Sequence, residues 1–101
     1  MDKEKILKAL DSGKIKWRKH ALERMLQRGI SRSKVKAALK NGEIIKTYEA
    51  DVPFGSALFF YMDKKPIHVV ASLDENNNTI YIITAYIPND IYFYDDLKTR
   101  R

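Results

Sequence analysis

Three polar side chains of the N-terminal half, His20, Arg24 and Arg28, lie four residues apart. On an α-helix, which turns by about 100° per residue, they fall within an arc of about 80°. Arginine binds phosphate through two parallel hydrogen bonds and histidine titrates near neutral pH, so the trio is suited to hold and act on a phosphodiester. A solvated helix face would show the same spacing. The pattern therefore indicates either a phosphate site or ordinary surface.

A second basic row, Arg32, Lys36 and Lys40, repeats the spacing on the helix that we expect to follow. Lysine is a default residue of an exposed helix, so this row needs no functional explanation. If it has a function, we expect it to add affinity for a polyanion rather than chemistry.

His68 interrupts an apolar stretch whose alternate residues must face a core: Ile67, Val69, Ala71 and Leu73. His68 therefore lies on the opposite sheet face. In the next apolar stretch the more apolar parity is Tyr81, Ile83, Ala85 and Ile87. This leaves Thr84 and Tyr86 on the same face as His68. If the two strands pair with their core-facing residues on one side, which needs a turn with an odd number of residues, His68 lies beside Thr84 or Tyr86. Such a group could transfer protons and orient a phosphate; the alternative is a histidine hydrogen-bonded in a half-buried sheet.

Several other chemistries are excluded by composition. The sequence has no cysteine, which removes disulfides, thiol catalysis and thiolate zinc sites and fits a reducing cytoplasm. It also has no glycine-rich phosphate loop and no HExxH motif. We therefore expect neither a cofactor nor a metal. Charge interrupts the N-terminal residues and no run of about 18 apolar residues occurs, so we expect a cytoplasmic protein without a membrane partner.

The charge is unevenly distributed along the chain. Residues 1–46 hold 14 Lys/Arg against 5 Asp/Glu, a net of +9, and residues 47–101 hold 5 against 8, a net of −3; together these give the overall +6. A positive half of this kind favours a nucleic acid or another polyanion as partner. The alternative is a surface that only keeps the protein soluble.

The elements that must position these residues can be predicted from caps and periodicity. Asp2 caps a short helix that Gly13 ends, and residues 14–17 are an extended link or a short edge strand. Residues 19–28 form an amphipathic helix that ends at Gly29, and Ser31 caps a third helix that runs to residues 41–42. From residue 43 the apolar residues alternate, which predicts strands near 43–49, 56–63, 66–73 and 79–87. Because tight turns join them, these strands must be antiparallel.

The sequence thus predicts one α+β domain over residues 1–101, with N-terminal helices packed on a four-stranded or five-stranded antiparallel sheet. We expect residues 1–13 to be a peripheral helix and residues 91–101 to be a short helix or an extended tail. The expected core includes Leu22, Met25, Leu26, Val35, Leu39, Phe59, Val69 and Ile83.

Several segments together resemble one bacterial family. They are HALERMLQRGIS at residues 20–31, the strand 43–48, residues 53–56, PIHVV at 66–70, IITAY at 82–86 with Pro88, and the final Arg100-Arg101. Over about residues 16–101, the chain resembles the family called domain of unknown function 4258. That family is similar to the RelE/ParE-like and BrnT-like toxins. The resemblance implies a RelE-like core over residues 14–101, RNA cleavage, often on the ribosome, and an antitoxin protein as partner.

By this resemblance, the motif residues are His20, Arg24, Arg28, His68, Thr84, Tyr86 and Arg100. Metal-free RNA cleavage needs a base, a proton donor and charge stabilisation at the phosphate. We expect His68 to be the base or acid, Tyr86 its partner or a stacking platform, and Arg24 with Arg28 to stabilise the phosphate; His20 is also expected in the catalytic group. The expected RNA-binding residues are Arg28, Thr84, Arg100, Arg32 and Lys36.

Two functions therefore compete: a metal-independent endoribonuclease of a toxin–antitoxin pair, and a noncatalytic module that binds nucleic acid or protein. The resemblance makes the endoribonuclease the leading hypothesis. No glutamate accompanies His68 in its strand, and the sheet half is net acidic, which keeps the noncatalytic module as the alternative. Geometry separates them. If His68 is buried under side chains, or if the sheet separates it from Arg24, the two cannot act on one phosphate.

Overall fold

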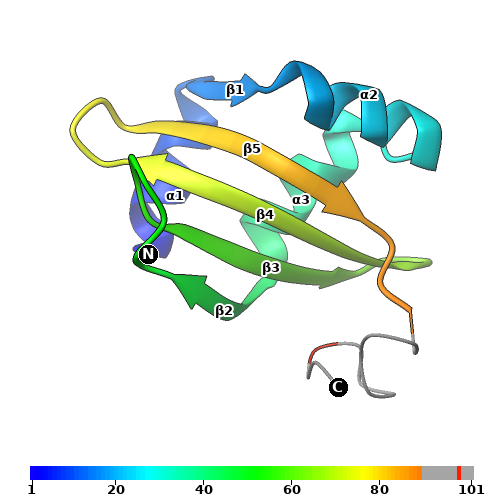
Figure 1. The fold of residues 1–101 in the computed structure, drawn as a ribbon. Helices are drawn as coiled ribbons and strands as arrows, with labels where there is room; N and C mark the ends of the chain where they lie inside the picture. The colour runs from blue at the N-terminus through cyan, green and yellow to red at the C-terminus, as the bar shows by residue number, and fades with distance from the viewer. Residues whose placement is uncertain (90–97, 99–101) are drawn as a thin grey trace.

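The computed structural model describes residues 1–89 and residue 98 (Figure 1). Arg100 and the expected C-terminal helix or tail lie outside the described residues, apart from Lys98. The elements follow in the order α1 (Lys3–Asp11), β1 (Ile15–Trp17), α2 (Lys19–Arg28), α3 (Arg32–Asn41), β2 (Glu43–Tyr48), β3 (Ser56–Met62), β4 (Pro66–Asp74) and β5 (Thr79–Tyr86).

The helix ends are set by the residues that the sequence indicated. The Asp2 carboxylate accepts a hydrogen bond from the Glu4 N–H (2.9 Å), and the Ser31 hydroxyl accepts one from the Lys34 N–H (3.1 Å). Gly29 ends α2 in the left-handed conformation (φ 68°), which glycine adopts at low cost. These caps satisfy backbone groups that a helix leaves unpaired. The predicted bounds of α2, residues 19–28, are confirmed.

The five strands form one sheet in the order β1-β5-β4-β3-β2. Strands β2 to β5 are antiparallel neighbours, as the tight turns predicted, and β1 is the fifth strand, parallel to β5. The first strand therefore lies beside the last. The α+β fold is confirmed, and the expected strand bounds differ from the observed ones by one residue at most.

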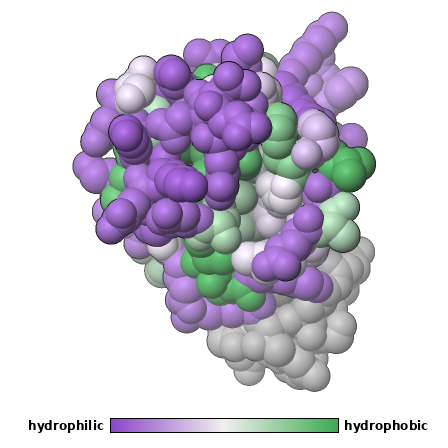
Figure 2. All heavy atoms as spheres, turned by 90° about the vertical axis from the view of Figure 1, so that its left-hand side faces the viewer, coloured by the Kyte–Doolittle hydropathy of each residue, from purple (hydrophilic) through white to green (hydrophobic). Residues whose placement is uncertain are grey.

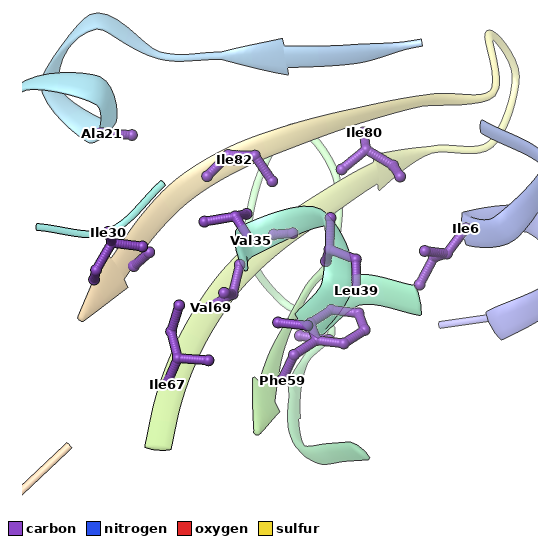
Figure 3. Close-up of a cluster of buried hydrophobic side chains, with 14 of the residues drawn as sticks. Ile6, Ala21, Ile30, Val35, Leu39, Phe59, Ile67, Val69, Ile80 and Ile82 are labelled. Atoms are coloured by element: carbon purple, nitrogen blue, oxygen red, sulfur yellow. The ribbon is translucent and has the colours of Figure 1, made fainter. Parts of the chain in front are cut away.

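Helices α1 and α3 lie behind one face of the sheet, and α2 lies along its β1–β5 edge (Figure 1). The core between the helices and the sheet contains Val35, Leu39, Phe59 and Val69, each with no exposed surface (Figure 3). We call this side of the sheet the helix face and the other side the second face. Helix α1 is not peripheral in its packing, because Ile6 and Ala9 are buried in the same core.

Strand β5 contains a bulge that reverses its alternation. Val70 pairs with Thr84 but Ala71 pairs with Ile82, so Ile83 is an extra residue. Near the turn, Ile80 and Ile82 are therefore in the core, while Ile83 turns to the second face and is only half-buried. The expectation that Ile83 belongs to the core is wrong for this reason.

The turn before β5 is closed by Asp74. Its carboxylate accepts hydrogen bonds from the Asn77 side-chain amide (2.8 Å), the Asn77 N–H (3.2 Å) and the Asn76 N–H (3.1 Å). The side-chain bond from Asn77 lowers the pKa of Asp74 most; burial opposes it and the two backbone bonds support it, so the net shift is downward.

Helix α2 is rotated relative to the expected orientation. Ala21 and Met25 are its buried residues, Leu22 is partly buried, and Leu26 is 84% exposed, so the prediction of Leu26 in the core is wrong. On the inner side, the Arg28 guanidinium reaches the sheet, where Nη1 donates to the Ala85 carbonyl (2.8 Å). The helix thus packs through Ala21, Met25 and part of Leu22, while Leu26 points to solvent.

Candidate functional site

His68 lies at the centre of a row of three aromatic rings on the second face. It pairs with Phe60 of β3 on one side and with Tyr86 of β5 on the other. His68 Nδ1 lies 3.2 Å from the Tyr86 hydroxyl, and the two ring centroids are 5.2 Å apart. The Phe60 ring meets the imidazole edge-on at 5.8 Å. The predicted neighbourhood of His68 and Tyr86 is therefore confirmed.

Thr84 lies on the same face, opposite Val70 and two residues from Tyr86 along β5. The turn has four residues between the paired Asp74 and Thr79, not the odd number expected, and the Ile83 bulge restores the register. His68, Thr84 and Tyr86 thus share one face as predicted, although the turn geometry that produces this differs.

His68 is completely buried, with 0% of its surface exposed. Lys98 lies over one end of the aromatic row: its Nζ is 5.1 Å from the Phe60 ring centroid and 3.1 Å from Glu43 Oε2. An imidazole and a phenol at this distance can share a proton. A buried imidazole cannot touch the phosphodiester of a polymer unless its surroundings move.

Helix α2, which carries His20 and Arg24, runs along the β1–β5 edge of the sheet (Figure 1). Ala21 and Met25 place α2 in the core of the helix face, whereas His68 projects from the second face. The His20 side chain is 90% exposed, 3.7 Å from Glu23 Oε2, and Arg24 is exposed as well. The structure therefore does not bring His20 and Arg24 together with His68 and Tyr86.

Arg28 has a structural contact that the sequence pattern did not reveal. Strand β1 pairs with β5 only as far as Ile82, and Arg28 bonds the Ala85 carbonyl beyond that point. An unpaired strand edge needs such a partner. The guanidinium thus lies at the sheet edge, next in sequence to Tyr86.

The second basic row is at the surface. Arg32, Lys36 and Lys40 are exposed on α3, and the Arg32 guanidinium lies 5.8 Å from the centroid of the Trp17 ring. This contact joins the row on α3 to β1, whose Lys16 is also exposed. The helical half therefore carries many cations that solvent can reach, which is the arrangement that a polyanion requires.

A hollow beside Arg18 was not predicted. It has a volume of about 510 Å³ and lies between the loop 49–55, Ser72 and the β5 side chains Tyr81 and Ile83. We call it the loop hollow. The sequence signal was the apolar Phe54 in a turn, but strand periodicity does not tell on which residues a loop folds back.

The described residues contain neither a metal-binding group nor a membrane-spanning helix. Among residues 1–89 and Lys98, no three His, Asp or Glu side chains are grouped so that they could hold a metal ion. Within the same residues, no helix has the length and apolar character needed to cross a bilayer.

Comparison with known proteins gives one match. No curated protein and no solved structure matches the chain. The sequence model of one protein family matches residues 17–87, which begin in β1 and end one residue after β5. The matched segment thus contains α2, α3 and the aromatic row of His68. Because the match covers more than half of the chain, the protein belongs to the family described as Domain of unknown function (DUF4258).

Proposed function

We propose that this protein is a toxin-like, noncatalytic module that binds RNA through the exposed cations of β1, α2 and α3. The observation that carries the proposal is the charge distribution: residues 1–46 have a net charge of +9, and Arg24, Arg32, Lys36 and Lys40 are all exposed. Phosphate neutralisation by such residues releases counterions and drives binding without sequence readout.

The position of His68 favours binding over cleavage. The imidazole is buried and projects from the sheet face opposite the one on which α2 packs. Base, proton donor and phosphate stabiliser must lie within reach of one phosphate, and the burial of His68 argues against such a group. The proposed partners are RNA, including RNA on the ribosome, and an antitoxin protein that would cover the basic surface.

The test is RNA binding by fluorescence anisotropy between 50 and 200 mM salt. We expect the affinity to fall steeply with salt, with a slope of about −0.7 per neutralised phosphate on single strands. The variant Arg24→Glu/Lys36→Glu should abolish binding, because it reverses two exposed charges of the basic surface. The matched control, Lys64→Glu/Lys65→Glu in the β3–β4 turn, should bind as wild type. Equal losses from both pairs would show that diffuse charge, not the helical half, does the binding.

A second candidate, metal-independent RNA cleavage, rests on the 3.2 Å contact between His68 and the Tyr86 hydroxyl. This pair could serve as acid and base if the side chains above it moved aside. Induced expression of wild type and His68→Ala, scored for growth arrest and RNA fragments, separates the two candidates. RNA cleavage that depends on His68 would overturn the noncatalytic proposal in favour of the nuclease. Growth arrest without RNA cleavage would support the noncatalytic proposal.

A further inference from the structure

We propose that the loop hollow holds one unpaired nucleobase, so that the protein selects single-stranded over duplex RNA. The hollow lies on the second face, near the β4–β5 turn, away from the aromatic row of His68. Its volume of about 510 Å³ is in the range of small-molecule pockets, which fits a base with its sugar but not a duplex. This inference rests on the proposed function and names what part of the RNA the site takes.

One wall of the loop hollow is a pair of stacked aromatic rings. The rings of Phe54, from the loop, and Tyr81, from β5, have centroids 5.8 Å apart and planes 14° apart. Both residues line the hollow and both are partly exposed. A base can extend such a stack irrespective of its identity, because every base has a π-face.

The floor depends on the bulge in β5. Tyr81 and Ile83 are two residues apart, so they share one face by ordinary alternation, and both line the hollow. The bulge decides which face this is: counted back from the buried Ala85, a regular strand would point both side chains into the core. Bulges often re-aim side chains at binding sites, and here the bulge adds an apolar side chain beneath the aromatic stack.

Polar groups surround the rim on one side. Arg18 lines the hollow, and its side chain makes no capping hydrogen bond to α2. Lys16 pairs with Tyr81 in the β1–β5 register, so its exposed side chain lies on the same face. Asp51 also lines the hollow, and its carboxylate accepts a hydrogen bond from the Ser56 hydroxyl. The two cations outnumber this carboxylate, which suits a nucleotide with its base in the hollow and its phosphate at Arg18 and Lys16.

The opposite side of Phe54 has the reverse charge. There a second hollow, of about 430 Å³, is lined by Glu49, Asp74 and Glu75. Seen from this end, the surface is mostly hydrophilic with separate apolar areas (Figure 2). An anionic chain is repelled from the acidic hollow and attracted to the side of Arg18, so the field gives the RNA one direction of approach.

The probe for the test is a ten-nucleotide RNA with 2-aminopurine at one position, compared with the same sequence in a duplex. We expect wild type to bind the single strand at least tenfold more tightly than the duplex and to quench the 2-aminopurine fluorescence. Phe54→Leu and Tyr81→Leu should lose the preference and the quenching but keep the duplex affinity, which the cations set. Tyr81→Phe keeps the ring and should keep both.

Tyr48→Leu is the matched control, because Tyr48 is also a half-buried tyrosine on a strand but does not line the loop hollow. It should bind as wild type. Thermal melts identify any variant that fails to fold, and the comparison of single strand with duplex by wild type then carries the test. Equal binding of single strand and duplex by wild type, or a full preference in Phe54→Leu, would overturn the inference alone; such a hollow would take another ligand, such as a peptide. No binding of either RNA would overturn the proposed function and the inference with it.

Discussion

At the scale of single residues, Gly42 has no room for a side chain. A Cβ atom there would meet the backbone oxygen of Ala38 and would lie 2.7 Å from that of Phe60. Backbone atoms cannot turn aside as a flexible side chain can. The residue between α3 and β2 therefore allows the helix to end directly against the sheet.

We expect Gly42→Ala to lower the free energy of unfolding by about 1–3 kcal/mol, as overpacking does. Urea denaturation measures it. Gly55→Ala is the control, because the nearest atom to its Cβ would be Glu49 Cα at an ordinary 3.6 Å, and its effect should stay within about 0.5 kcal/mol. Similar losses in the two variants would mean that glycine entropy, and not close approach, matters at Gly42.

Two adjacent residues of α2 should respond very differently to truncation. Met25 is 2% exposed, so Met25→Ala should cost about 2–5 kcal/mol through the cavity it leaves. Leu26 is exposed, so Leu26→Ala should change stability by no more than about 0.5 kcal/mol. The same denaturation curves measure both. A large loss from Leu26→Ala would indicate that this leucine is covered in solution.

Asp74 gives a prediction for pH. The hydrogen bond from the Asn77 side chain lowers its pKa in the folded state, so the carboxylate stabilises the fold above the unfolded pKa. That stabilisation is lost as the pH falls through the folded pKa. Asp74→Ala should therefore melt at a lower temperature than wild type at pH 7, with the difference shrinking in acid. Melting curves between pH 7 and pH 2 test this; a difference that stays constant would show that the carboxylate charge is not involved.

At the scale of elements, the edge of β5 depends on α2. Arg28→Met keeps most of the side-chain stem but removes the hydrogen bond to the Ala85 carbonyl, and we expect a loss of about 1 kcal/mol. Arg24→Met, one turn earlier and exposed, should leave stability unchanged and weaken RNA binding. If Arg28→Met is as stable as wild type, water replaces the guanidinium at this edge.

The bounds of α2, α3 and the strands were predictable because caps, glycines and turn residues act locally. The face of α2 was not, because Leu22, Met25 and Leu26 form one apolar stripe in the sequence, whereas only Met25 is fully buried and Leu26 is exposed. Small Ala21 and long Arg28 lie with Met25 on the side that packs, and an apolar pattern gives little weight to either residue. The bulge could not be predicted for a similar reason. Residues 80–83 are all apolar or aromatic, so the sequence fits a core-facing position for either alternate set of residues.

At the scale of the whole molecule, the sequence predicted which residues neighbour His68 but not whether a substrate can reach it. Register is set by the strand itself, so Tyr86 could be placed beside His68. Burial depends on what covers the second face, for example Lys98 over Phe60, and no strand pattern reports this. The loop hollow was missed likewise, because it is made by a loop and strand residues that are distant in sequence.

The pairing of β1 with β5 has a consequence for synthesis. Ile15 pairs with Ile80, and Arg28 bonds Ala85. Both partners lie in β5, so β1 and α2 lack them until β5 has been synthesised. Contacts between such distant residues close late and slow the search for the fold. While the chain is still on the ribosome, its basic half has emerged without the sheet that arranges it. The contacts that hold β1 and α2 against the sheet form only after β5 has emerged, so under the proposed function the chain binds RNA only once its synthesis is nearly finished.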